Sequence, residues 1–148
     1  DAEIDLLKVL KDNLSVVTVE GNRVGLTFGR FDSYVGEVAH LVSRLLDATG
    51  LPALFAAVEV GNVTFLIGRS RTPQVSAEKA LAPLGGGGHD EAASVSLKGI
   101  TAFEALERLK ETLKSAVKPS KRVSDIMTSP AITVPESYTV KEARTVLM

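Results

Sequence analysis

Residues 84–94 read L-G-G-G-G-H-D-E-A-A-S. Four consecutive glycines, at positions 85–88, are followed by His89, one of only two histidines in the chain. Because glycine has no Cβ atom, such a run can adopt positive φ angles and admit another group very closely. Successive N–H groups can then converge on an anion. From these residues alone, a phosphate cradle and a structural turn are equally good interpretations.

The surroundings of the glycine run add donors for an anion. Arg69-Ser70-Arg71 ends a predicted strand, and His89 supplies a directional N–H donor. A basic strand end in solvent and an ordinary surface histidine remain the alternatives. The common phosphate motifs are absent, because no G-x-x-x-x-G-K-[ST] occurs and Glu91 stands where G-x-G-x-x-G needs its last glycine.

Two hairpins are predicted upstream. The runs at 15–20 and 23–28 flank Gly21-Asn22, and the runs at 54–60 and 63–68 flank Gly61-Asn62. A Gly-Asn pair between two alternating runs is typical of a two-residue hairpin turn. A further strand is predicted at 93–98, directly after the glycine run and a short helix at 76–82.

Helical periodicity predicts three longer helices. The helix at 2–13 is expected to bury Ile4, Leu7, Leu10 and Leu14. The helix at 34–49 has Asp32 or Ser33 as its expected N-cap and ends at Gly50. It is expected to leave His40 in solvent and to bury Val35, Val38, Val42, Leu45 and Leu46. The third begins at the capping box Thr101-Ala-Phe-Glu104 and is expected to bury Phe103, Leu106, Leu109 and Leu113.

These elements predict an α/β or α+β fold, with a mixed sheet built from two hairpins and a later strand, flanked by helices. The chain has 148 residues, 45% of them hydrophobic, which allows a real core. Because the net charge is −1, the overall charge of the chain gives no reason to expect a polyanion partner. The chain has no cysteine and no metal-ligand spacing, so no metal site or cofactor is expected in it. No apolar run reaches membrane-spanning length, and we expect a cytoplasmic protein.

The glycine run and the segment I-G-R-S-R at 67–71 resemble the DHH-associated substrate-binding domain of the DHH phosphoesterases. That family includes single-strand exonucleases, nano-RNases and pyrophosphatases. The G-G-G-G-H-x-x-A-A pattern is highly specific, and the resemblance covers residues 15–116. It implies that the substrate's phosphates and terminal nucleotide are held by Arg69, Ser70, Arg71, Gly85, Gly86, Gly87, Gly88 and His89. The catalytic domain of the family binds Mn²⁺ or Mg²⁺ through an Asp-His-His signature that this sequence lacks.

Residues 123–143, V-S-D-I-M-T-S-P-A-I-T-V-P-E-S-Y-T-V-K-E-A, resemble the start of a CBS regulatory domain. This order of domains is similar to a bacterial poly(A) polymerase/tRNA nucleotidyltransferase-like family, with a DHH domain upstream and CBS and nucleotidyltransferase domains downstream. The expected layout is therefore a helical lead-in at 1–14 from an upstream domain, the substrate-binding domain at 15–116, a linker at 117–122 and a partial CBS domain at 123–148.

The resulting hypothesis is a domain that recognises phosphate-bearing single-stranded nucleic acid, RNA above all, or a nucleotide, and is not catalytic alone. Its parent would be a multidomain RNA-processing enzyme. Asp90-Glu91 departs from the family, where neutral or basic residues are commoner, and like charges repel near a phosphate. The alternative is therefore a structural spacer or a homodimerisation module that has lost substrate binding.

Overall fold

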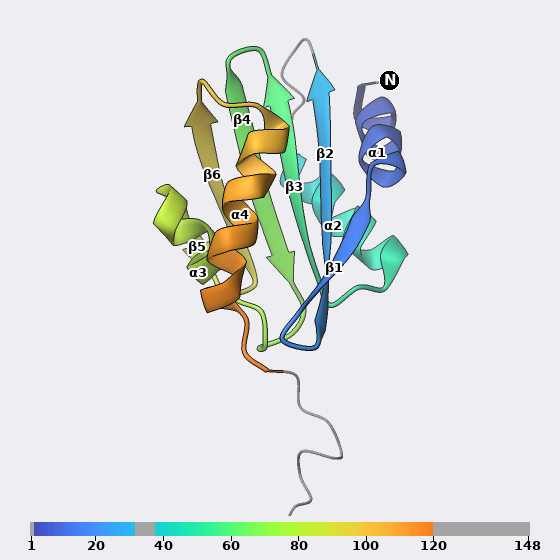
Figure 1. Cartoon of the computed structure of the whole chain (residues 1–148). Helices are drawn as coiled ribbons and strands as arrows, with labels where there is room; N and C mark the ends of the chain where they lie inside the picture. Colours follow the sequence, from blue (N-terminus) through green and yellow to red (C-terminus); the bar gives the residue numbers. More distant parts are fainter. Residues whose placement is uncertain (1, 32–37, 120–148) are drawn as a thin grey trace, which may run out of the picture.

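The structure is a computed structural model that describes residues 2–31 and 38–119, with side chains from residue 4 onwards. Six strands form one mixed sheet in the order β1-β2-β3-β4-β6-β5 (Figure 1). The neighbours β2 and β3 run parallel, and every other neighbouring pair is antiparallel. The predicted fold class is confirmed. The strands are β1 (Ser15–Val19), β2 (Asn22–Phe31), β3 (Ala53–Val60), β4 (Val63–Ser70), β5 (Gly87–His89) and β6 (Ala92–Lys98).

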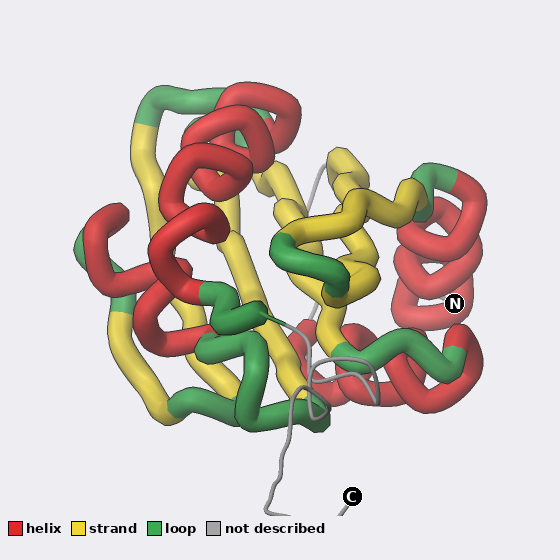
Figure 2. The backbone as a smooth tube through the Cα atoms, turned by 60° about the horizontal axis from the view of Figure 1, so that its bottom comes forward, coloured by secondary structure: helices red, strands yellow, loops and turns green. Residues whose placement is uncertain are grey.

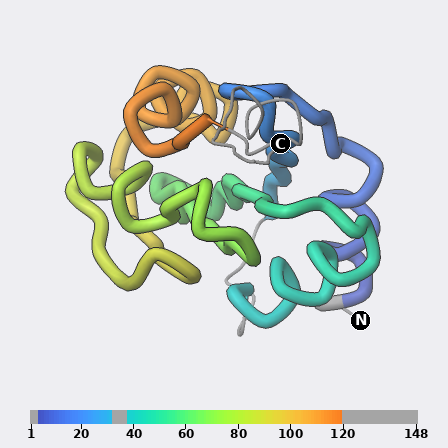
Figure 3. The backbone as a smooth tube through the Cα atoms, turned by 90° about the horizontal axis from the view of Figure 1, so that it is seen from below, coloured from blue at the N-terminus to red at the C-terminus, as the bar shows by residue number. Residues whose placement is uncertain are grey.

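Helices cover both faces of this sheet, as the view along the strands in Figure 3 shows. On one face lie α3 (Ala77–Leu81), a 3-10 turn η1 (Ala82–Leu84) and α4 (Ala102–Ala116); on the other lie α1 (Ala2–Asp12) and α2 (Val38–Thr49). The central strand β3 contributes side chains to the cores on both faces of the sheet. Phe55 packs with α3 and α4, whereas its neighbour Leu54 packs with α1 and α2. No described helix has the length and apolar composition needed to cross a membrane.

The second predicted hairpin turn is confirmed, and the first is displaced by one residue. Val60 pairs with Val63, so Gly61-Asn62 is the two-residue turn as predicted. In the first hairpin Val19 pairs with Asn22, so the turn is Glu20-Gly21, whose φ angles are 51° and 81°. Asn22 instead begins β2, because its buried side-chain amide donates to the Glu20 carbonyl at 3.2 Å and to the Lys118 carbonyl at 2.8 Å.

Two predicted helix faces need correction. Ile4 is 65% exposed, whereas Leu6 and Leu10 are fully buried. The face of α1 is set by Gly29 of β2, where an added Cβ would lie 3.2–3.6 Å from Val9, Leu10 and Leu6. In α4, Phe103 is 66% exposed and the buried face is Ala102, Ala105, Leu106, Leu109, Leu113 and Ala116. Small alanines let this helix approach the sheet closely, a packing mode that a search for large apolar residues does not detect.

The other helical predictions are confirmed within the described residues. The buried face of α2 includes Val38, Val42, Leu45 and Leu46, and also Leu41, which was not predicted. His40 is exposed, as expected. Gly50 ends the helix with φ 70° and donates its N–H to the Leu46 carbonyl at 3.2 Å. The predicted start at 34, the caps Asp32 and Ser33, and Val35 lie outside the described residues.

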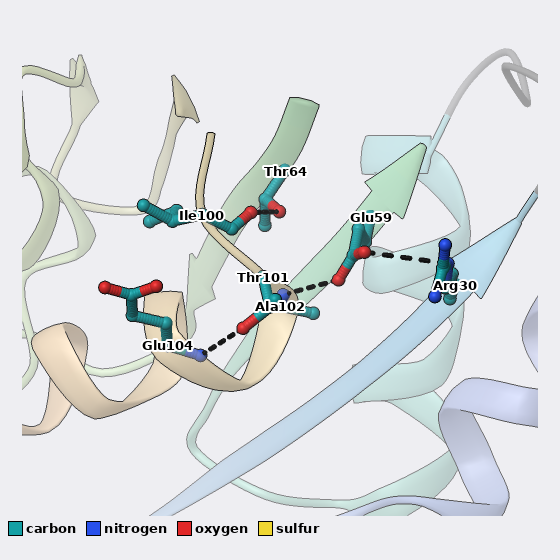
Figure 4. A network of polar contacts seen from close by, with 7 residues as sticks. All are labelled: Arg30, Glu59, Thr64, Ile100, Thr101, Ala102 and Glu104. Atoms are coloured by element: carbon teal, nitrogen blue, oxygen red, sulfur yellow. Dashed lines mark hydrogen bonds and ion pairs between the residues drawn. The ribbon is translucent and has the colours of Figure 1, made fainter. Parts of the chain in front are cut away.

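The start of α4 is fixed at one end of the sheet (Figure 4). The Thr101 hydroxyl accepts from the N–H of Glu104 at 3.1 Å, which confirms the predicted N-cap. In addition, Glu59 Oε1 accepts from the N–H of Ala102 at 2.8 Å, while Oε2 lies 3.6 Å from Arg30 Nε. Because β2 and β3 end here and β4 starts here, the Arg-Ser-Arg segment lies at the opposite end of the sheet.

The chain remains attached to the domain beyond α4. Val117 pairs with Val75, and the N–H of Lys118 donates to the Gln74 carbonyl at 2.8 Å. Residues 117 and 118, expected in a linker, therefore pack on the domain. The remainder of the predicted linker and the segment at 123–148 that resembles a CBS domain lie beyond the described residues.

Candidate functional site

The sheet register brings two of the predicted site residues into one row. Arg69 of β4 pairs with Ala92 of β6, and Ala92 pairs with His89 of β5. Directly paired residues project from the same face of a sheet, so Arg69 and His89 flank a single alanine methyl group. With strands spaced by about 4.8 Å, their Cα atoms lie roughly 10 Å apart. Figure 2 brings this end of the sheet forward.

The glycine run forms no four-residue nest. The N–H of Gly85 donates to the Ala82 carbonyl at 2.9 Å, and that of Gly86 to the Leu81 carbonyl at 3.0 Å. These two groups close the end of α3 and η1, so the expected convergence of four N–H groups on an anion does not occur. Gly87 and Gly88 belong instead to β5, which is an edge strand of the sheet.

Three of the four glycines have a structural reason to be glycine. Gly85 and Gly88 have φ angles of 94° and 142°. A Cβ on Gly86 would lie 2.7 Å from the Ser94 carbonyl oxygen, and one on Gly88 would lie 2.4 Å from that of Ala92. Gly87 is different, because an added Cβ meets nothing within 4 Å. Gly87 therefore borders open space beside the row of Arg69 and His89.

The backbone of Gly88 remains available at the sheet edge. His89 and Ala92 are the closing pair of a two-residue hairpin, and N–H groups along an antiparallel strand point alternately toward and away from the partner. The regular alternation of an antiparallel strand would direct the N–H of Gly88 away from β6. Of the two interpretations of the glycine run, its first two residues follow the structural turn, and Gly87 and Gly88 form an edge strand.

The acidic pair Asp90-Glu91 is the turn of this hairpin, a role that sequence reasoning missed. The Asp90 carboxylate accepts from the Ser76 hydroxyl at 2.5 Å, and its carbonyl accepts from the N–H of Ala77 at 2.8 Å. The Glu91 carbonyl accepts from the N–H of Ser70 at 3.0 Å. The turn is thus bonded to the start of α3 and to the end of β4, which holds His89 in place.

The three residues of the Arg-Ser-Arg segment behave differently. Ser70 is 5% exposed and its hydroxyl donates to the Thr72 carbonyl at 2.9 Å, so this side chain shapes the loop. Arg71 forms an ion pair with Asp47 of α2. The Nε of Arg69 is buried and has no hydrogen-bond partner among the described residues. Arg69 is therefore the cation whose donor is unsatisfied.

Three adjoining hollows surround these side chains. The largest, about 640 Å³, is lined by the basic residues Arg71, His89 and Lys118 and by the acids Glu78, Asp90 and Glu91, together with Thr72 and Pro73. A second, about 290 Å³, contains both Arg69 and Arg71. A third, about 180 Å³, contains Arg69, Gly87 and Gly88. The predicted residues thus gather at one end of the sheet but are divided among hollows that share lining residues.

Helix α2 supplies a wall that the sequence did not predict. Ala39 lines the smallest hollow and Ser43 the second. Together with Asp47 they recur every four residues, the spacing of one helix face. The small side chains of Ala39 and Ser43 leave room above Arg69. The helical periodicity of the sequence places Ala39, Ser43 and Asp47 on one face of a helix. It does not show that this face lies against β4, because that contact is made only in the folded chain.

This end of the sheet gathers several hydrogen-bond donors. Arginine and histidine side chains supply donors there. The Ser76 hydroxyl, which donates to the Asp90 carboxylate, also accepts from the N–H of Lys79 and so caps α3. Among residues 2–31 and 38–119, no group of three or more His, Asp or Glu side chains is placed to hold a metal ion.

Comparison with known proteins identifies the family. The model of the DHHA1 domain matches residues 15–118. Over 145 residues the chain is 34% identical to the A-adding tRNA nucleotidyltransferase of Geobacter sulfurreducens, a match that covers 98% of the chain and 16% of that relative. The chain thus spans about a sixth of the relative's length.

Solved structures share the fold. An exopolyphosphatase-related protein from Bacteroides fragilis superposes with a TM-score of 0.62 at 18% identity, covering 78% of this chain and 35% of the other. RecJ from Thermus thermophilus, in complex with Mn²⁺, gives a TM-score of 0.50 at 21% identity, covering 89% and 18%. The match over residues 15–118 includes the glycine run, Arg69 and His89, and the chain belongs to the DHHA1 domain family.

Proposed function

We propose that this chain is the substrate-recognition domain of a larger, cytoplasmic RNA-processing protein, and that it binds the phosphate-bearing end of a single-stranded RNA or a nucleotide. The observation that carries the proposal is the buried Nε of Arg69, which has no hydrogen-bond partner within residues 2–31 and 38–119. It lies in one row with His89 and beside Gly87. A buried donor without a partner costs free energy, and an anion would offset that cost.

The proposed mechanism is electrostatic positioning. Arg69 contributes a planar guanidinium that matches the geometry of phosphate oxygens, and His89 and the Gly88 N–H contribute donors from the facing edge strand. These groups are held by strands and by the bonded Asp90-Glu91 turn, so little reorganisation is needed on binding. Ser70, Gly85 and Gly86 support the site by shaping its loops.

The catalytic chemistry is assigned to other parts of the parent protein. We place Mn²⁺ or Mg²⁺ in an upstream DHH domain, with RecJ in complex with Mn²⁺ as the structural precedent. The relative named A-adding tRNA nucleotidyltransferase supports a parent that acts on tRNA. CBS and nucleotidyltransferase domains downstream remain part of this proposal.

One observation favours the alternative, a spacer or homodimerisation module without substrate binding. The largest hollow carries three acids, Glu78, Asp90 and Glu91, beside its three basic residues. However, the Asp90 carboxylate already accepts a short hydrogen bond from Ser76, and none of the described residues that line the hollow with Gly87, Gly88 and Arg69 is acidic. The substrate-binding function is therefore preferred, at the edge formed by β4, β6 and β5.

Fluorescence anisotropy with a labelled, 5′-phosphorylated RNA trinucleotide tests the proposal. Arg69→Gln should weaken binding and flatten its dependence on salt concentration by about 0.7 in the logarithmic slope, the contribution of one single-strand phosphate. Arg108→Gln, which removes the same charge from the exposed surface of α4, should leave both quantities nearly unchanged. Equal binding by the parent and Arg69→Gln, or no binding by the parent even at low salt, would overturn the proposal.

A further inference from the structure

The ion pair between Asp47 and Arg71 joins α2 to the end of β4. The two side chains are 59% and 52% exposed, so the pair is in contact with solvent. The backbone of Arg71 is fixed separately, because its N–H donates to the Pro52 carbonyl at 2.8 Å. Breaking the ion pair therefore needs only a rotation of the Arg71 side chain.

The position of Asp47 on its helix is electrostatically unfavourable. α2 ends at Thr49, and its last turn carries no basic residue. The C-terminal end of a helix has partial negative charge, which disfavours a carboxylate there. Arg71, which comes from the end of β4, is the cation that offsets this repulsion. The pair thus joins a carboxylate at the negative end of a helix to an arginine of the candidate site.

Arg71 lies where two of the hollows meet. It lines the 640 Å³ hollow with His89 and the 290 Å³ hollow with Arg69, whereas Asp47 lines neither of them. A phosphate that enters either hollow and uses the Arg71 guanidinium must compete with the Asp47 carboxylate. Arg69, by contrast, has an unpartnered Nε among the described residues. One arginine of the site is therefore available, and the other is already neutralised.

We propose that Asp47 is a positioning residue that acts through Arg71 as an internal competitor of the ligand's phosphate. The inference rests on the proposed function and deepens it. An anion held by Arg69 alone leaves the Asp47–Arg71 pair intact, whereas a longer polyanion that reaches both arginines displaces Asp47. The pair thereby lowers the affinity for every ligand that engages Arg71, which restricts full engagement of the site to ligands with more than one phosphate contact.

A double-mutant cycle of Asp47→Asn and Arg71→Gln tests this inference in the full chain. The probe is the 5′-phosphorylated RNA trinucleotide, measured by anisotropy over a range of salt concentrations. Asp47→Asn should raise affinity about two- to five-fold, the scale measured for exposed ion pairs, and steepen the salt slope by about 0.7. In the Arg71→Gln background the same substitution should have no effect, because the residue through which it acts is gone.

The matched control is Glu107→Gln, which removes one carboxylate from a similar exposed ion pair with Lys110 on α4. It should leave affinity and slope unchanged. A gain that persists in the Arg71→Gln background would show a general effect of charge and overturn the inference. So would a parent that binds the trinucleotide as tightly as Asp47→Asn does. A parent that does not bind at all overturns the proposed function, and the inference with it.

Discussion

Replacing Gly88 by alanine should destabilise the domain, whereas the same change at its neighbour Gly87 should not. At Gly88 the new Cβ would lie 2.4 Å from the Ala92 carbonyl oxygen and 2.7 Å from the Ala93 Cα. Restoring ordinary contact distances near 3.5 Å needs a separation of β5 from β6 by roughly 1 Å. In addition, the φ of 142° is a conformation that residues with a Cβ adopt only at a cost.

The expected magnitude follows from these two terms. A residue forced into such a backbone conformation costs about 1–3 kcal/mol, and the contact with Ala92 and Ala93 adds to it. We therefore expect Gly88→Ala to lower the free energy of unfolding by about 2–3 kcal/mol. Gly87→Ala should stay within about 0.5 kcal/mol of the parent, because its Cβ meets nothing within 4 Å.

Urea unfolding followed by circular dichroism measures both variants. With a slope of about 1–3 kcal/mol per molar urea, Gly88→Ala should lower the midpoint by about 1 M or more. Equal midpoints for Gly88→Ala and Gly87→Ala would refute the assignment of residues 87–89 to a strand packed against β6. A large loss for Gly87→Ala alone would refute it as well.

Three further predictions concern the site, the helix cap and the catalytic status. Gly87→Val should keep the urea midpoint but abolish RNA binding, because its side chain would fill the hollow beside Arg69; undiminished binding would contradict this placement. Glu59→Ala should lower the free energy of unfolding by about 1.5–3 kcal/mol, the range for hydrogen bonds to charged groups, because the N–H of Ala102 loses its acceptor. A loss of stability no larger than that of Glu107→Ala would disprove the capping role. The chain alone should not hydrolyse bis-p-nitrophenyl phosphate with Mn²⁺, and turnover that co-purifies with it and falls in His89→Ala would refute that expectation.

Local signals predicted the elements well. The turn Gly61-Asn62 and the cap Thr101 are encoded within a few residues, so their chemistry is legible in the sequence. The first hairpin shows the limit of such signals. The Gly-Asn motif predicts a positive φ at Asn22, but in the structure Glu20 has it. The reason is that the Asn22 side chain is hydrogen-bonded to the carbonyl of Lys118, a partner 96 positions away.

The arrangement of the site was predictable only in part. The sequence and its family resemblance supplied the candidate residues, which stay a prediction, but the row of Arg69, Ala92 and His89 depends on the order β4-β6-β5. The ion pair of Asp47 with Arg71 likewise joins a helix to a strand end across 24 positions of the chain. The glycine run suggested a cradle, whereas in the fold its first two N–H groups close a helix.

The most direct test of the central claim is a titration of the ¹⁵N-labelled chain with the 5′-phosphorylated RNA trinucleotide, followed through backbone amide chemical shifts. The account predicts that the largest shifts occur at Arg69, Gly88, His89 and Ala92, around the row shared by β4, β6 and β5. Amides on the exposed side of α4, such as that of Lys110, should not move. Shifts concentrated on α4, or no shifts at RNA concentrations that saturate an independent binding assay, would contradict it.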